Sequence, residues 1–152
     1  MARNPSESSM LHLIKLCVGV ESLQELQAWQ KKRLAEKRKK GQKPELIHVT
    51  RQTPKRAGEL LAGGSLYWVI KGQIAARQQF IDIREVRSKD GPPRCGLVYD
   101  AKLIPTLRRA HRPFQGWRYL NAADAPQDAR EAKGGKGLPE ALRAELAELG
   151  LL

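Results

Sequence analysis

The stretch GGSLYWVIKGQIAARQ, residues 63–78, decides most of what the sequence indicates about the fold. Its apolar run over 66–70 contains β-branched and aromatic side chains, which favour a buried strand. Gly63 and Gly64 end a preceding short helix, and Gly72 allows a turn or a bulge after the run. The sequence therefore predicts a buried strand that leads directly into a change of direction.

A hairpin is predicted after this turn. Ile81 and Ile83 alternate with charged residues, as in a half-exposed strand over 78–87. The sequence KDGPP that follows is typical of a turn, and residues 95–99 supply the second arm. Phe80 falls on the polar side of this alternation, which leaves the register open.

The segment before the buried strand predicts a strand and a long helix. Residues 1–9 are polar and are expected to form a flexible tail, whereas the apolar run over 11–18 has the length of a strand. Ser22, followed three residues later by Glu25, fits a capping box at the start of a helix. Seven of the ten residues in 31–40 are basic. We therefore expect the helix to leave the core midway and to project its second half into solvent.

Four shorter elements are predicted in the rest of the chain from their caps and apolar runs. They are a strand over 46–49, a short helix capped by Thr53 and ending near Ala62, a short helix capped by Asp100 that contains Leu103, Ile104 and Leu107, and a strand over 117–120.

The order of these elements favours an α+β fold with a mixed, mostly antiparallel sheet, because a hairpin stands where crossover helices would be needed for a parallel one. We expect a single core domain over 10–127 with a basic N-terminal helix. The segment 128–137 is rich in charge, Gly and Ala, and is expected to be a linker. A short C-terminal helix is expected over 138–152. Its apolar face consists of Leu142, Leu146 and Leu149.

The charge of the chain points to an anionic partner. The sequence has 152 residues with 28 Lys plus Arg and 16 Asp plus Glu, a formal net charge of +12. Residues 31–60 hold eleven basic and three acidic side chains, and residues 91–120 hold six and one, so the excess lies in two segments. A polyanion is the favoured partner, and a merely solvated basic surface is the alternative.

Other partners and compartments are constrained by what the sequence lacks. The apolar stretch over 10–20 is about half the length of a membrane-spanning helix, and the N-terminus does not have the order of a secretory signal. Cys17 and Cys95 lie far apart, and no Cys or His pair has the spacing of zinc ligands. We expect a cytoplasmic protein without a membrane, metal or cofactor role.

Aromatic and basic residues are interleaved in two stretches, residues 63–78 and 112–120, which together hold five of the eight aromatic side chains. Unpaired bases stack on such rings, so this mixture favours single-stranded or looped nucleic acid. Trp68 is expected to pack in the core, whereas Trp117 is balanced between packing and stacking. The candidate nucleic-acid-binding residues are Lys31, Lys32, Arg33, Lys37, Arg38, Lys39, Lys40, Lys71, Arg77, Arg108, Arg109, Arg112, Gln115, Trp117, Arg118 and Tyr119.

Two other functions stay open. In a small enzyme acting on a phosphorylated or nucleotide substrate, Lys71, Arg77 and Arg112 would form an anion clamp, and His48 would act as acid or base. No P-loop, dinucleotide fingerprint or nucleophile elbow accompanies them. In an adaptor, the C-terminal helix would dock on a protein partner and the basic segments on ribonucleoprotein.

Two long stretches carry a family resemblance. They are HVTRQTPKRAGELLAGGSLYWVIKGQIAARQ, residues 48–78, and RRAHRPFQGWRYLNAADAP, residues 108–126. Both resemble the bacterial family called domain of unknown function 1489, over about residues 11–128, and that name implies no activity. The expected fold is also similar to small RNA-binding pseudobarrels of the PUA-like kind, which combine a short helix, a mixed sheet and a basic cleft. The leading hypothesis is nucleic-acid binding, with RNA preferred to DNA.

Overall fold

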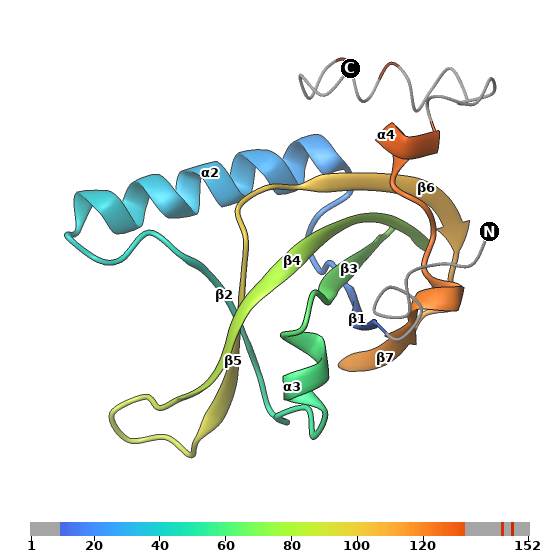
Figure 1. The fold of residues 1–152 in the computed structure, drawn as a ribbon. Coiled ribbons are helices and arrows are strands. Elements are labelled where there is room, and N and C mark those ends of the chain that lie inside the picture. The colour runs from blue at the N-terminus through green and yellow to red at the C-terminus, as the bar shows by residue number, and fades with distance from the viewer. Residues whose placement is uncertain (1–9, 133–143, 145–146, 148–152) are drawn as a thin grey trace.

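The computed structural model describes residues 10–132 together with residues 144 and 147, and it shows a strongly curved sheet crossed by one long helix (Figure 1). Its elements are β1 (Leu11–Leu16), α2 (Leu23–Lys39), β2 (Leu46–Thr50), α3 (Ala57–Leu60), β3 (Ser65–Ile70), β4 (Gln73–Val86), β5 (Arg94–Tyr99), β6 (Ile104–Ala110), β7 (Trp117–Asn121), the short 3-10 helix η1 (Ala122–Asp124) and α4 (Ala129–Ala132).

The sheet is mixed and mostly antiparallel, which confirms the predicted α+β class. Its strand order is β2-β5-β4-β3-β1-β7, and β6 pairs with β4 off this path. Only the β1–β3 pair is parallel among the described strands. β4 is long enough to serve two groups of strands, because its first half pairs with β3 and β6 and its second half with β5. Its bend carries the sheet around the core (Figure 1).

The curvature brings the two ends of the strand order, β2 and β7, close to each other. The indole nitrogen of Trp117 in β7 donates to the backbone oxygen of Gln52, 3.3 Å away, just after β2. The backbone N–H of Arg56 donates to the hydroxyl of Tyr119 at 3.2 Å. We call the gap between β2 on one side and β1 and β7 on the other the seam. The seam positions the candidate site described below.

The core is built on β3, whose six residues are all buried. Trp68 is only 4% exposed, and its indole nitrogen donates to the side-chain oxygen of Gln78 at 2.9 Å. Gln78 also exchanges two hydrogen bonds with Gln30 of α2, at 2.8 and 2.7 Å. These bonds satisfy the buried polar groups and fix the helix to the sheet. The prediction that Trp68 packs in the core is confirmed.

The long helix follows its sequence signals. Ser22 caps it by accepting a hydrogen bond from the backbone N–H of Glu25 at 3.1 Å, and the Glu25 carboxylate reaches back to the N–H of Glu21 at 2.8 Å. Leu23 and Leu26 are buried, whereas the basic residues from 31 onward are mostly exposed. The first half of the helix is thus packed on the core and the second half exposes most of its cations, but Leu34 in the second half still packs against the core.

One predicted short helix begins later than expected, and another is wrong. α3 begins at Ala57 with Arg56 as its N-cap and without a side-chain cap bond, so Thr53 does not start a helix. The segment with Leu103, Ile104 and Leu107, which was expected to be helical behind Asp100, is not helical, because Ile104 and Leu107 lie in β6. The exposed edge of β4 explains this strand, since its backbone groups need partners beyond the end of β5. Asp100 instead accepts from the N–H of Lys102 at 2.8 Å, as in an Asx turn.

The hairpin of β4 and β5 is confirmed, but its details differ from the simple alternation. β4 begins at Gln73, well before residue 78, because the turn after β3 is tight. The register shifts between Phe80 and Asp82, so Ile81 is an extra residue on this strand. Ile81 is therefore 59% exposed and Phe80 is buried, the reverse of the predicted pattern.

The first part of the predicted linker is packed on the sheet. Asp128 forms an isolated bridge with Thr106 of β6, and α4 follows with Ala129 fully buried. The core thus extends beyond residue 127. The flexible tail predicted over 1–9 and the rest of the linker lie outside the described residues. So does most of the predicted C-terminal helix, of which only Ala144 and Ala147 are described, both helical and exposed.

Candidate functional site

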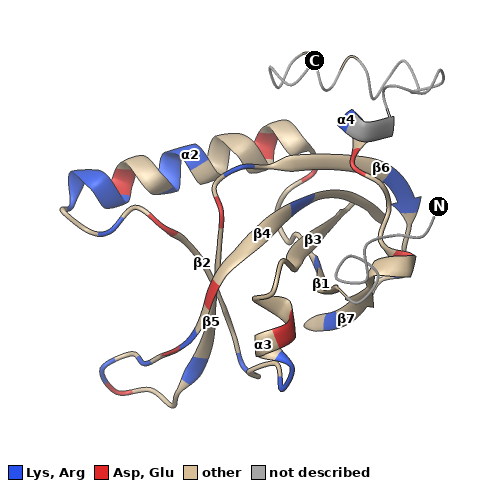
Figure 2. Cartoon of the chain, viewed as in Figure 1, with Lys and Arg blue, Asp and Glu red and all other residues tan. Residues whose placement is uncertain are grey.

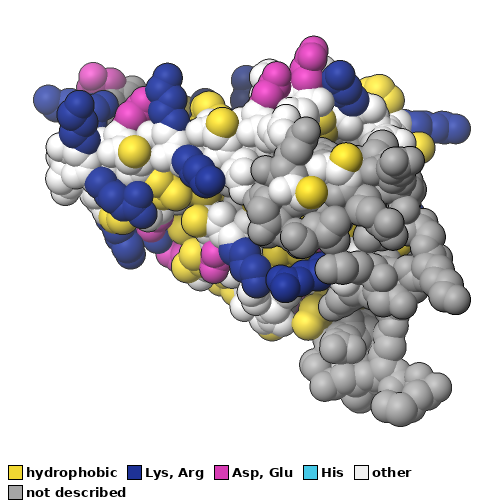
Figure 3. Space-filling model, turned by 90° about the horizontal axis from the view of Figure 1, so that it is seen from above, with side chains coloured by type: hydrophobic (Ala, Val, Ile, Leu, Met, Phe, Trp, Pro, Cys, Tyr) yellow, Lys and Arg dark blue, Asp and Glu magenta, His cyan; other side chains and the backbone are white. Residues whose placement is uncertain are grey.

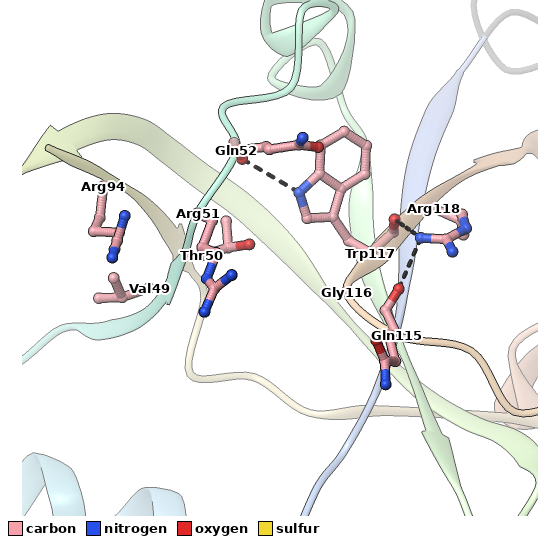
Figure 4. A pocket seen from close by; sticks show the side chains of 9 residues that line it. All are labelled: Val49, Thr50, Arg51, Gln52, Arg94, Gln115, Gly116, Trp117 and Arg118. Atoms are coloured by element: carbon pink, nitrogen blue, oxygen red, sulfur yellow. Dashed lines mark hydrogen bonds between the residues drawn. The ribbon is translucent and has the colours of Figure 1, made fainter. Parts of the chain in front are cut away.

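A cavity of about 590 Å³ opens at one end of the seam (Figure 4). Three segments far apart in the sequence build it: the end of β2 with the residues after it, the start of β5, and the loop that enters β7. We call it the basic cleft. It is lined by Val49, Thr50, Arg51, Gln52, Arg94, Gln115, Gly116, Trp117 and Arg118. Three of these described residues are arginines and none is acidic.

One wall of the basic cleft carries Arg51 and Arg94. The β2–β5 ladder ends with Thr50 opposite Cys95, so Arg51 and Arg94 are the next pair in the same register. Their guanidinium groups make no hydrogen bond or ion pair with any other described residue. Like charges at opposite positions of neighbouring strands repel each other. An anion bound between them would relieve this repulsion.

The opposite wall is formed by the loop into β7, where a bend at Gly116, with φ of +71°, turns the chain. Arg118 donates to the backbone oxygens of Gln115 and Trp117, at 2.7 and 2.9 Å, and lies over the ring of Phe114. These contacts hold its guanidinium close to the loop. Figure 4 shows Arg51 and Arg94 on one side of the cavity and this loop on the other.

Trp117 is half-buried at the border of the basic cleft. Its ring contacts that of Tyr119 edge-on, with 5.1 Å between the centroids, and its indole nitrogen is bonded across the seam to Gln52. Tyr119 in turn lies beneath the Arg56 guanidinium, 5.6 Å from it. Trp117 therefore packs against the fold with one part of its ring and lines the cavity with another. The sequence had left packing and exposure for stacking equally open, and the structure combines packing with partial exposure.

The basic half of α2 lies elsewhere. β2 begins near the end of α2 and runs away from it, so the basic cleft is at the opposite end of that strand (Figures 1 and 2). The α2 cations gather at the far end of the helix, at the left of Figure 3. Of the seven candidates there, Lys37 is half-buried and donates to the backbone oxygen of Glu45. The structure thus separates two basic regions that the prediction combined.

Several predicted binding residues hold the fold together instead of lining the basic cleft. Arg77 makes two hydrogen bonds of 2.8 Å to the carboxylate of Asp128 and another to the hydroxyl of Ser65. Arg108 donates to the backbone oxygen of Ala75, and Arg109 donates to that of Asp124. Arg108 thus ties β6 to β4, and Arg77 and Arg109 fix these strands to the segment that precedes α4.

The predicted anion clamp around His48 is not assembled. Lys71 is in the turn after β3, where it forms an exposed pair with Glu21 at 3.9 Å, and Arg112 is exposed after β6. His48 lies inside the seam, with its ring edge-on to Trp68 at 6.0 Å. Burial, together with the charge of Lys15, lowers the pKa of His48 to about 4. None of the three clamp residues lines the pocket that contains it.

Other classes of site are not found in the described part of the chain. No group of three or more His, Cys, Asp or Glu side chains there is placed to hold a metal ion. Cys17 is half-buried and Cys95 is buried, and both thiols are free. The helices described are all too short or too polar to cross a bilayer.

The list of candidate nucleic-acid-binding residues includes Gln115, Trp117 and Arg118 but neither Arg51 nor Arg94, and from sequence Arg51 is considered only beside His48 and Thr50, as a polar corner suited to a phosphate. Each of the two arginines is isolated in its own segment, and only the β2–β5 register places them side by side. A signal for that pairing is present in principle, because both residues flank short apolar runs of strand length. Choosing which strands pair requires the tertiary structure.

Fold and site together define a basic α+β protein with a curved mixed sheet and an arginine-lined cleft at its seam. The chain belongs to the family described as "Protein of unknown function (DUF1489)", whose model matches residues 13–152. This match confirms the resemblance carried by residues 48–78 and 108–126. No curated protein and no solved structure matches the chain.

Proposed function

We propose that this protein binds single-stranded RNA in the cytoplasm through the basic cleft. The observation that carries the proposal is the cavity of about 590 Å³, which is lined by three arginines and by Trp117 and has no acidic side chain among its described lining residues. Arginines hold phosphates by paired hydrogen bonds, and unpaired bases stack on aromatic rings. The combination fits a flexible strand better than a rigid duplex, whose bases are enclosed.

The curved sheet supports the choice of RNA over DNA. β4 is shared by two groups of strands and the ends β2 and β7 meet at the seam, an arrangement that favours a PUA-like pseudobarrel. That likeness is one of fold, and it raises the expectation of RNA without identifying a target. The exposed cations of α2 add a second, sequence-independent contact to phosphates.

Fluorescence anisotropy with a labelled 12-nucleotide RNA of mixed sequence tests the proposal. The full-length protein is titrated against the single strand, its duplex and the matching DNA strand, at several KCl concentrations. Two phosphates held by Arg51 and Arg94 in the basic cleft contribute about −1.4 to the slope of log affinity against log salt concentration, at roughly −0.7 each. Single-stranded RNA is expected to bind more tightly than either competitor.

A matched pair of variants locates the binding. R94A removes a cation from the basic cleft, and K102A removes an exposed one beyond the opposite end of β5. R94A is expected to weaken binding and to reduce the salt slope by about 0.7, whereas K102A leaves both unchanged. Absence of binding at low salt, a salt-independent affinity, or equal losses in the two variants would each overturn the proposal.

A further inference from the structure

A second pocket of about 440 Å³ lies in the seam, toward the start of α2. Aromatic rings form much of its wall: Trp68 lies edge-on to His48 at 6.0 Å and to Tyr99 at 5.8 Å. Trp29 of α2 lines it from the other side and is 51% exposed. We call it the aromatic pocket. Its size and its flat, apolar walls fit a single planar ring system.

The rim of the aromatic pocket exposes more apolar surface than the fold requires. Val18 is 86% exposed in the loop between β1 and α2, and it lines the pocket together with the half-exposed Trp29. Exposed apolar side chains that converge on one cavity are typical of a binding site, whereas scattered ones need no explanation. A ring inserted here would cover both residues.

Two polar groups are available inside the aromatic pocket. Lys15 is half-buried, and its ammonium makes no hydrogen bond or ion pair with any other described residue. Burial lowers its pKa, and no described carboxylate compensates. His48 is held neutral by burial, so its ring offers one donor and one acceptor. A ligand with acceptor atoms on its edge would satisfy Lys15, and a cationic ligand is disfavoured.

The aromatic pocket and the basic cleft are neighbours along the seam. Lys15 of β1 pairs directly with Trp117 of β7, so the two side chains stand on the same face, one in each cavity. On the opposite side, His48 and Val49 are consecutive in β2 and line one cavity each, so their side chains lie on opposite faces of that strand. The two cavities thus adjoin at the Lys15–Trp117 pair, where a strand bound in the basic cleft would pass the aromatic pocket.

We infer that the aromatic pocket takes one unstacked nucleobase from the RNA strand whose phosphates lie in the basic cleft. The inference rests on the proposed function and names the group that the site selects. The base stacks on Trp29, the exposed ring of the pocket, and the ammonium of Lys15 donates to a ring nitrogen or carbonyl oxygen on its edge. A free nucleotide offers the same ring, so the experiment includes both sources.

The test uses the full-length protein and a six-nucleotide RNA with one 2-aminopurine, whose fluorescence falls when it stacks on an aromatic ring. Nucleoside monophosphates serve as the free source. W29A removes one wall and is expected to weaken RNA binding about tenfold and to restore most of the fluorescence, since base stacking is worth roughly 1–3 kcal/mol. W29F keeps a ring and is expected to retain binding.

Two more variants separate a local effect from a general one. K15M keeps the length of the side chain without its charge, and it is expected to weaken binding of the RNA without lowering stability. I81A removes an exposed apolar side chain on β4, away from the seam, and is the control. Trp29 and Lys15 do not line the basic cleft, so their variants leave its arginines in place.

The outcomes distinguish the inference from the proposed function. RNA binding that needs Arg94 and loses its quenching in W29A supports both. RNA binding that needs Arg94 but is unchanged in W29A and K15M overturns the inference and leaves the proposed function standing. Monophosphates that bind in a Trp29-dependent way while RNA does not bind overturn the proposed function and the strand-bound base. Binding of neither probe overturns both.

Discussion

The basic cleft and the distal half of α2 are both cationic, yet they present their charge differently. At the end of α2 and its C-cap, seven of the ten residues in 31–40 are basic, and most of them are exposed. In the basic cleft only three arginines are present, but they line one cavity with an aromatic ring. Solvated lysines on a convex surface lose most of their field to screening, whereas arginines in a concave site focus it. We therefore expect concavity to be a better guide to the binding site of this protein than charge density along the chain.

A second difference separates Arg51 and Arg94, which make no ion pair with another described residue, from arginines that are paired with carboxylates. Arg77 is as conspicuous in the sequence as Arg94, but Asp128 neutralises it, and Ser65 accepts a third hydrogen bond. Arg84 is likewise shared between Asp82 and Glu45. A guanidinium already paired at 2.8 Å has little to offer a phosphate.

The largest effect is expected from reversing charge in the basic cleft. The double variant R51E/R94E and the double variant K39E/K40E change the net charge equally. We expect about a hundredfold loss of RNA affinity, roughly 3 kcal/mol, for the first, because two phosphate contacts become repulsive in a concave site. The α2 variant is expected to lose less than fivefold. Anisotropy titrations at one salt concentration measure both, and equal losses would remove the distinction between the two regions.

An intermediate effect is expected when the ion pair of Arg77 is broken. Its side chain is 22% exposed and that of Asp128 is 15% exposed, so D128A leaves a largely buried guanidinium without its partner. We expect the free energy of unfolding to fall by about 2 kcal/mol, while RNA affinity stays within twofold. Urea unfolding measures the first quantity.

The exposed pair of Arg87 and Glu85 is the control for this prediction, with side chains 67% and 57% exposed. E85A is expected to change stability by less than about 0.5 kcal/mol. If D128A is as mild as E85A, then Arg77 is not held by the ion pair. The conclusion that Arg77 stabilises the fold through Asp128 would then be wrong.

The elements that were predicted correctly depend on local patterns. The apolar run of β3, the capping box of α2 and the turn between β4 and β5 are each specified within about ten residues of sequence. The errors arise where distant partners decide. Residues 104–110 become β6 because the edge of β4 is available, and Phe80 is buried because a bulge shifts its register. Local propensity is a weak prior in both places.

The candidate site shows the same limit. Gln115, Trp117 and Arg118 were found because they are contiguous and mix aromatic with polar groups. The pairing of Arg51 with Arg94 depends on the β2–β5 register. The neighbourhood of Lys15 and Trp117 likewise depends on β1 and β7 being adjacent. Both cavities are created by the pairing of strands that are distant in sequence. A short stretch of sequence does not specify such pairing.

The smallest effect is expected from a change of pH. It tests how well the region around Arg77 is shielded from water. His12 is buried beside Arg77 and Asp128, and its Nδ1 accepts a hydrogen bond from the N–H of Ser65 at 2.9 Å. Burial, with the charge of Arg77 adding to it and that of Asp128 opposing it, lowers the pKa of His12 from 6.5 to about 4. The unfolded chain thus takes up a proton at a higher pH than the folded protein does, and the free energy of unfolding falls as the pH drops from 6.5 toward 4.

The variant H12N tests this prediction, because its side chain keeps an acceptor for the N–H of Ser65 and cannot titrate. The wild-type protein is expected to lose about 1 kcal/mol more than H12N between pH 8 and 5.5 in urea unfolding, since His48 titrates equally in both. Identical pH profiles would mean that water and protons reach His12, and that Arg77 beside it is less enclosed than its contacts indicate.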